Sequence, residues 1–153
     1  ARRRDFTVVN LVPGVELPAG MPVNAYRMGL VGAVAHRLCD PGQQVPLHQL
    51  SRSPGKIAAA AGIGNPARFF ATLRQAGLAF EELPLPDHYD FAVSPFDNIA
   101  ADIILITEKD AVKCALVTEL KNDPRLWVVP VAAHLDGVLA QRILEKCRGH
   151  SIA

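Results

Sequence analysis

The segment LPLPDHYDF, residues 83–91, places several ionisable side chains within a proline-rich stretch. Its two prolines fix φ and lack backbone donors, so we expect a stiff loop rather than helix interior or a central strand. An imidazole beside a carboxylate is suited to proton transfer near neutral pH, which makes His88 the first candidate for chemistry. Asp87, Tyr89 and Asp90 are its neighbouring candidates. The alternative is a loop in which the histidine only bonds a neighbour and the aromatic rings pack.

A second candidate is GIGNP, residues 62–66, which follows an apolar run and opens a helical pattern. Backbone donors at such a junction can cradle a phosphate. Neither G-x-G-x-x-G nor G-x-x-x-x-G-K-[ST] occurs in the chain, however, and Pro66 lacks a donor. A structural turn, with Asn65 as the helix N-cap, is therefore the favoured interpretation, while Arg68 in the first helical turn keeps direct phosphate contact open as the alternative.

The TEKD segment, residues 107–110, has the spacing of a reciprocal helix cap between a hydroxyl and a carboxylate. This pattern predicts a structural role for Asp110. The helix that follows is expected to bury Val112, Leu116 and Leu120 on one face, because these residues recur at four-residue intervals.

Lys109 and Lys113 lie four residues apart on another face of the same predicted helix. Two such lysines are typical of a solvated helical surface, which is the favoured interpretation. Contact with an anionic substrate or a nucleotide is the alternative.

Neither metal binding nor a cysteine nucleophile is predicted within the chain. Four of the five histidines stand in unrelated contexts, with no H-x-x-x-H pair and no carboxylate at ligand spacing. They are His36, His48, His134 and His150. The three cysteines are widely spaced and form no C-x-x-C pair, so we expect buried, reduced thiols rather than disulfides. They are Cys39, Cys114 and Cys147.

The elements that must position these candidates alternate between short apolar runs and helical patterns from residue 56 onward. Predicted strands span residues 56–63, 78–83, 102–107 and 126–131, and predicted helices span residues 66–76 and 136–149, with a third helix after residue 107. This alternation predicts an α/β fold with a mostly parallel sheet and flanking helices.

The first part of the chain, to about residue 50, is expected to be partly irregular or β, since its apolar runs are broken by proline and glycine. Residues 5–10 are expected to form a strand, and residues 24–38 fit either a strand pair or a partly helical run. We therefore divide the chain into residues 1–55, with strands and loops, and an α/β domain over residues 56–153.

The composition limits the classes of function. With 153 residues, of which 50% are hydrophobic and 20% charged, the chain can bury the core of an ordinary domain. A net charge of +1 gives no case for a nucleic-acid partner, and the short basic run at residues 2–4 is assigned no function. The apolar stretches fall far below the roughly 20 residues of a membrane helix. Because the chain begins at Ala1 without a methionine, we expect a piece of a longer protein.

Three motifs, read together, resemble a known family. AGIGNPARFFATLRQAGL at residues 61–78, PDHYDF at 86–91 and ITEKDAVKC at 106–114 are similar to the C-terminal half of tetraacyldisaccharide 4'-kinase, the lipid A 4'-kinase of Gram-negative bacteria. The resemblance is specific over residues 56–127 and weaker but compatible over residues 3–50.

The resemblance implies a P-loop-type kinase that uses ATP and Mg²⁺ to phosphorylate the 4'-hydroxyl of a tetraacyldisaccharide 1-phosphate at the cytoplasmic face of the inner membrane. The family's phosphate-binding loop, metal-binding carboxylates and membrane-associated segment precede the matching region. Residues 1–55 would thus join the chain to the missing ATP-binding half. The chain alone is expected to be soluble and inactive.

In the family, the histidine of the P-D-H motif pairs with an aspartate from the N-terminal half that serves as the base, and this histidine matches His88. The resemblance implies no metal ligand in this chain. Other candidates near the substrate or the nucleotide are Asp87, Tyr89, Asn65, Arg68, Lys109 and Lys113.

A rival hypothesis comes from a different class of protein. The chain would be a freestanding α/β module that is not an enzyme and binds a phosphorylated sugar or a partner protein. Its support is the lack of a nucleotide-binding motif in the chain.

Overall fold

The computed structural model of the chain describes residues 5–11, 15–32 and 34–149. Backbone contacts divide the chain into two compact units. Unit 1 comprises residues 1–31 and 132–153, and unit 2 comprises residues 32–131. The basic run at residues 2–4 and His150 lie outside the described residues.

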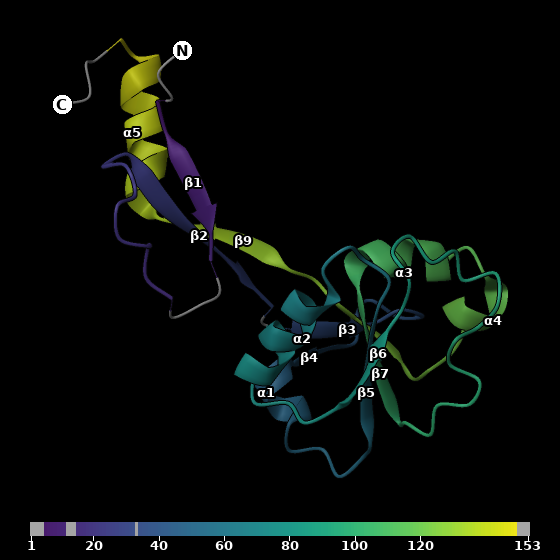
Figure 1. The fold of residues 1–153 in the computed structure, drawn as a ribbon. Helices are drawn as coiled ribbons and strands as arrows, with labels where there is room; N and C mark the ends of the chain where they lie inside the picture. The colour runs from purple at the N-terminus through teal and green to yellow at the C-terminus, as the bar shows by residue number, and fades with distance from the viewer. Residues whose placement is uncertain (1–4, 12–14, 33, 150–153) are drawn as a thin grey trace. The chain divides into compact units, whose positions relative to one another are not determined.

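Unit 2 is built on a six-stranded sheet in the order β4-β3-β8-β7-β5-β6 (Figure 1). The four strands β6, β5, β7 and β8 pair in parallel, while β3 and β4 add an antiparallel edge. This arrangement confirms the predicted mostly parallel sheet. The strands are β3 (Val34–Arg37), β4 (Gln44–Pro46), β5 (Ile57–Ala61), β6 (Glu81–Pro84), β7 (Ile103–Thr107) and β8 (Leu126–Val129).

Helices cover both faces of this sheet, as Figure 1 shows. Phe70 and Leu73 of α2 (Pro66–Gln75) pack with α1 (Leu47–Leu50) in one apolar cluster. Leu120 belongs to the other cluster, which α3 (Glu108–Cys114) and α4 (Thr118–Lys121) form on the opposite face. All five residues of β5 are buried, as expected for a parallel strand between two helical layers. The α/β class with flanking helices is thus confirmed.

The α2 helix forms where its capping residues predict it. The Asn65 side chain accepts a hydrogen bond from the Arg68 backbone N–H, and Pro66 occupies the first turn. At the other end, Gly77 adopts a φ of +82°, a conformation that glycine tolerates and that ends the helix. The predicted helix over residues 66–76 is therefore confirmed to within one residue.

The helical region after Thr107 differs from the prediction. Instead of one helix, α3 ends at Cys114 and α4 begins only at Thr118. This break separates Leu120, which is 2% exposed, from Val112 and Leu116, which are 67% and 83% exposed. The predicted apolar face was wrong for these two residues, because the face of α3 that meets the sheet carries Asp110, Ala111 and Cys114.

Unit 1 contains a three-stranded sheet and the C-terminal helix. Strand β2 (Ala25–Val31) pairs in parallel with β1 (Thr7–Asn10) and antiparallel with β9 (Ala132–Leu135), which leads into α5 (Gly137–Cys147). The predicted strand over residues 5–10 and the predicted helix over residues 136–149 are confirmed to within two residues at each end. Figure 1 labels these elements.

The ambiguous segment over residues 24–38 forms two strands, β2 and β3, which belong to different units. Since β3 pairs with β8 and β9 pairs with β2, the chain leaves unit 1 after residue 31 and returns at residue 132. The units observed thus differ from the predicted division at residues 55 and 56. The sequence patterns around residues 55 and 56 gave no sign of this pairing between distant strands.

The cysteines differ from one another in exposure. Cys114 is buried, whereas Cys39 and Cys147 are exposed, so the expectation of buried thiols is wrong for these two. Burial raises the pKa of the Cys114 thiol to about 12, and the nearby Asp110 carboxylate acts in the same direction. Cys114 therefore stays a neutral thiol at physiological pH, which makes it a poor nucleophile.

This difference predicts selective alkylation. At about pH 8, iodoacetamide should modify Cys39 and Cys147 rapidly and Cys114 only after denaturation, because the thiolate is the reactive species. Peptide mass spectrometry of the natively labelled protein measures the modification at each site. Native labelling of Cys114 at the rate of the other two would contradict its burial.

Within the part of the chain that the structure describes, no helix combines the length and the apolar character that crossing a bilayer requires.

Candidate functional site at the carboxyl ends of the parallel strands

The sequence candidates gather where the parallel strands β5, β6 and β7 end. Parallel strands share one edge for their carboxyl ends, and open α/β sheets bind ligands at this edge. Residues 62–65 follow β5, residues 85–91 follow β6, and α3 begins directly after β7. Backbone and side-chain contacts join these three segments into one group, which we call the loop assembly.

Gly62 and Asp110 connect the first segment to the third. The Gly62 N–H donates to Asp110 Oδ2 over 3.0 Å, and the Thr107 hydroxyl donates to the same oxygen over 2.7 Å. Asp110 is 0% exposed. A Cβ atom on Gly62 would lie 3.0 Å from Asp110 Oδ1 and 3.2 Å from Tyr89 Cβ, so a side chain here would force Asp110 or Tyr89 to shift.

The predicted cap of α3 forms in part. The Thr107 hydroxyl accepts a hydrogen bond from the Asp110 N–H over 3.1 Å. The Asp110 carboxylate, however, bonds the Thr107 hydroxyl and the Gly62 N–H rather than the Thr107 backbone. Its structural role is therefore confirmed and is broader than expected, because it also fixes the loop after β5.

The proline-rich segment forms the loop that its composition predicts. Strand β6 runs to Pro84 at the edge of the sheet, where proline is tolerated. Beyond it, Phe91 is fully buried and its ring stacks edge-on against Tyr89 at a centroid distance of 5.0 Å. His88 and Phe91 both have a φ near +60°, which is uncommon for residues other than glycine. Packing thus holds the loop in a strained conformation.

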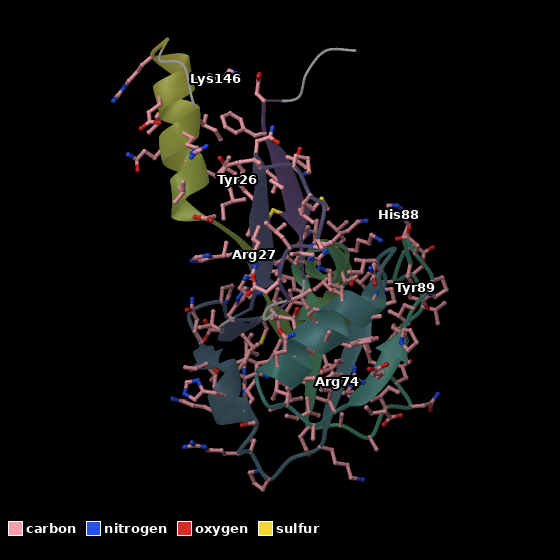
Figure 2. The ribbon with its side chains drawn as sticks, turned by 60° about the vertical axis from the view of Figure 1, so that its left-hand side comes forward. Tyr26, Arg27, Arg74, His88, Tyr89 and Lys146 are labelled. Carbon is pink, nitrogen blue, oxygen red and sulfur yellow. The ribbon has the colours of Figure 1, made fainter. Side chains whose placement is uncertain are left out.

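His88 itself is bonded through its backbone. Its N–H donates to the Gly62 carbonyl over 3.2 Å and to Asp87 Oδ1 over 3.0 Å. Its imidazole Nε2 lies 3.8 Å from Asp87 Oδ2, and the two side chains are 71% and 50% exposed. Figure 2 shows His88 at the rim of unit 2, directed away from the sheet. The imidazole is therefore accessible to another group while a carboxylate stands beside it.

Tyr89 and Lys113 have contacts within the loop assembly. The Tyr89 hydroxyl donates to the Val93 carbonyl over 3.0 Å. The Lys113 Nζ, which belongs to α3, donates to the Tyr89 carbonyl over 2.7 Å. The neighbouring Lys109 is exposed, so the two predicted helix-face lysines differ in environment.

The GIGNP loop has the contacts of a structural turn. The Gly62 N–H is bound by Asp110 and the Arg68 N–H by the Asn65 side chain, so two backbone donors of the junction are occupied. A Cβ on Gly64 would also lie 3.4 Å from the Asp87 carboxylate, whose charge opposes binding of a phosphate. These contacts support the structural interpretation that the sequence favoured.

Two links were missed by sequence reasoning: the bond from Asp110 to Gly62 and the bond from Lys113 to Tyr89. Both join residues 24 or more positions apart, and no local pattern signals such a contact. The sequence signal that could have indicated these contacts is that the glycine, proline and TEKD motifs each follow a predicted parallel strand, which places them at one edge of the sheet. Among the described residues, no group of three histidine, cysteine or acidic side chains could hold a metal ion.

Comparison with known proteins identifies the family. The family model described as LpxK, tetraacyldisaccharide-1-P 4'-kinase, matches residues 7–148. This chain belongs to that family. The match includes all three site segments and nearly all of both units, so it agrees with the resemblance seen in the sequence motifs.

Individual relatives agree with this assignment. Tetraacyldisaccharide 4'-kinase from Janthinobacterium sp. (strain Marseille) is 59% identical over 157 aligned positions, which cover 100% of this chain and 44% of the relative. The protein of the same name from Herminiimonas arsenicoxydans is 54% identical, with 100% and 45% covered. The chain thus spans less than half the length of these curated relatives.

A solved structure shares the fold. It is an LpxK from Aquifex aeolicus, described as an "apo" form in complex with ATP, and it matches 90% of this chain and 40% of its own with a TM-score of 0.52. The sequence identity is 21%, so this likeness concerns the fold.

Proposed function

We propose that this chain is the C-terminal part of a kinase that transfers the γ-phosphate of ATP to the 4'-hydroxyl of a tetraacyldisaccharide 1-phosphate, a step of lipid A biosynthesis. The observation that carries the proposal is the family match over residues 7–148, together with two relatives named tetraacyldisaccharide 4'-kinase. The loop assembly supplies the chemistry, because it presents an exposed imidazole beside a carboxylate at the carboxyl edge of a parallel sheet.

His88 is the proposed catalytic residue of this chain. In the reaction, the 4'-oxygen forms a bond to the γ-phosphorus while the bond from that phosphorus to the bridging oxygen of ADP breaks. The hydroxyl proton passes to an aspartate from the rest of the parent protein, and His88 pairs with this aspartate to orient it and to stabilise its ionised form. Phosphoryl transfer depends mostly on positioning and charge, so such a pair is a suitable proton acceptor.

The binding of ATP and Mg²⁺ is assigned to the preceding half of the parent protein. This half is proposed to bind ATP and Mg²⁺, since the chain has no phosphate-loop motif and its described residues offer no metal site. The likeness in fold to a protein described in complex with ATP supports the nucleotide. The lipid nature of the acceptor supports a location at the cytoplasmic face of the inner membrane.

An activity assay tests the proposal. The complete parent protein, supplied with ATP, Mg²⁺ and a tetraacyldisaccharide 1-phosphate, should form the 1,4'-bisphosphate, whereas residues 1–153 alone should form none. Mass spectrometry identifies the product, and an acceptor that lacks the 4'-hydroxyl is the control. Failure of the complete protein to phosphorylate this acceptor would overturn the kinase assignment. Activity of residues 1–153 alone would overturn the assigned division of labour.

A further inference from the structure

The conformation of His88 requires support from its surroundings. Its φ of +60° lies in the left-handed region, which side chains with a Cβ seldom occupy. A strained residue of this kind persists only when neighbouring groups hold it, and such residues gather at functional sites. The contacts that hold the backbone before and after His88 therefore decide where its imidazole points.

One support comes from the loop after β5. The Gly62 carbonyl accepts the His88 N–H, while the Gly62 N–H is bound by the buried Asp110 carboxylate. Asp110 Oδ1 is also buried and has no hydrogen-bond partner among the described residues. Burying a carboxylate that is only partly bonded costs stability, and here it fixes the glycine on which His88 rests.

Within the loop, the Tyr89 N–H donates to the Pro86 carbonyl over 3.1 Å, and a support from outside the loop comes from α3. The Lys113 ammonium donates to the Tyr89 carbonyl over 2.7 Å, a short, charge-assisted bond from a half-buried side chain. It holds the backbone on the C-terminal side of His88, at the Tyr89 carbonyl, whereas Gly62 holds the His88 N–H on the N-terminal side. Within the described part of the chain, Lys113 contacts the Tyr89 carbonyl rather than the imidazole, so its influence on His88 passes through the backbone.

We propose that Lys113 is a positioning residue for His88: by binding the Tyr89 carbonyl it holds the loop so that the imidazole meets its partner in the parent protein. This inference rests on the proposed function. It also departs from the direct role in binding substrate or nucleotide that the sequence left open for Lys113. A direct contact would chiefly change KM, whereas positioning changes kcat.

The test replaces Lys113 with methionine in the complete parent protein, which removes the donor and keeps an unbranched side chain one heavy atom shorter. We expect kcat to fall about 10- to 100-fold, as for a misplaced catalytic group, with KM changed less than about 2-fold. Lys113→Arg, which retains a donor, should recover most of the rate. Lys121→Met is the matched control, because this exposed lysine on α4 lies outside the loop assembly.

A double variant separates positioning from a general effect. In a His88→Asn background, Lys113→Met should cause no further loss of kcat, since its effect acts through the imidazole. Full additivity of the two losses, or a rise in KM with unchanged kcat, would overturn the positioning role. If His88→Asn alone leaves turnover unchanged, the proposed function of His88 fails instead.

Amide hydrogen exchange gives a readout that does not depend on kinase activity. Lys113→Met should speed exchange at the His88 N–H about 10-fold, because the bond to Gly62 would open more often. Exchange in β5 and β7 should remain unchanged, which shows that unit 2 is intact. Unchanged exchange at His88 would overturn the inference even if the parent protein proved to have another activity.

Discussion

Replacing His88 with alanine in the complete parent protein is expected to lower turnover by about 10²- to 10⁴-fold, the usual contribution of general acid–base catalysis. The imidazole is 71% exposed, and its Nε2 lies 3.8 Å from Asp87 Oδ2, beyond hydrogen-bond distance, so the fold does not depend on it. Its loss should therefore appear in kcat and leave the unfolding transition of the protein almost in place.

A second variant at His88 is needed because of the unusual backbone conformation of this residue. Alanine disfavours a φ of +60°, so His88→Ala can shift the loop as well as remove the imidazole. Asparagine accepts this conformation more readily and cannot act as an imidazole does. His88→Asn should therefore lose as much activity as His88→Ala. A large loss in the alanine variant with near-normal turnover in the asparagine variant would assign the effect to backbone strain.

His48 provides a control for the histidine substitutions. It is exposed on α1 of the same unit, outside the three segments of the loop assembly. His48→Asn should leave turnover within about 2-fold of the wild type, as expected for a surface substitution. Unchanged turnover in both His88 variants would reduce this histidine to a loop residue and leave the proton-accepting aspartate without the proposed partner.

Local sequence signals predicted the elements of unit 2 well where one residue sets the backbone. Asn65 and Pro66 begin α2, Gly77 ends it, and the two prolines after residue 83 place the loop at a sheet edge. These signals act over a few positions, so the chain reveals them without tertiary context. The parallel sheet followed from the same alternation of strands and helices.

Contacts between distant segments were beyond such reasoning. The pairing of β9 with β2 divides the chain differently from the predicted boundary, and no local pattern specifies a partner more than 100 positions away. Within the candidate site, the motif residues His88 and Asp87 were proposed from their types. The lysine that holds their loop was placed on a helix face but not matched to its acceptor, since a backbone carbonyl carries no sequence signal.

Because the helix breaks between α3 and α4, we expect substitutions of Leu116 and Leu120 to have different effects on stability. Helical periodicity had assigned these two leucines to one buried face. Leu120 is 2% exposed and packs with Ala111 and Cys114, whereas Leu116 is 83% exposed. Leu120→Ala should lower the free energy of unfolding of unit 2 by about 2–5 kcal/mol through lost burial and the cavity left behind. Leu116→Ala should change it by less than about 0.5 kcal/mol.

Amide hydrogen exchange along β7 measures this difference, because the buried amides of the central strand report the opening of unit 2. The two variants make the same chemical change four positions apart, so each is the control for the other. Equal losses would mean that the helix continues through residue 116 and buries the face that periodicity predicts. A loss confined to Leu120 means that the helix breaks after Cys114, so that Leu116 faces solvent while Leu120 returns to the core.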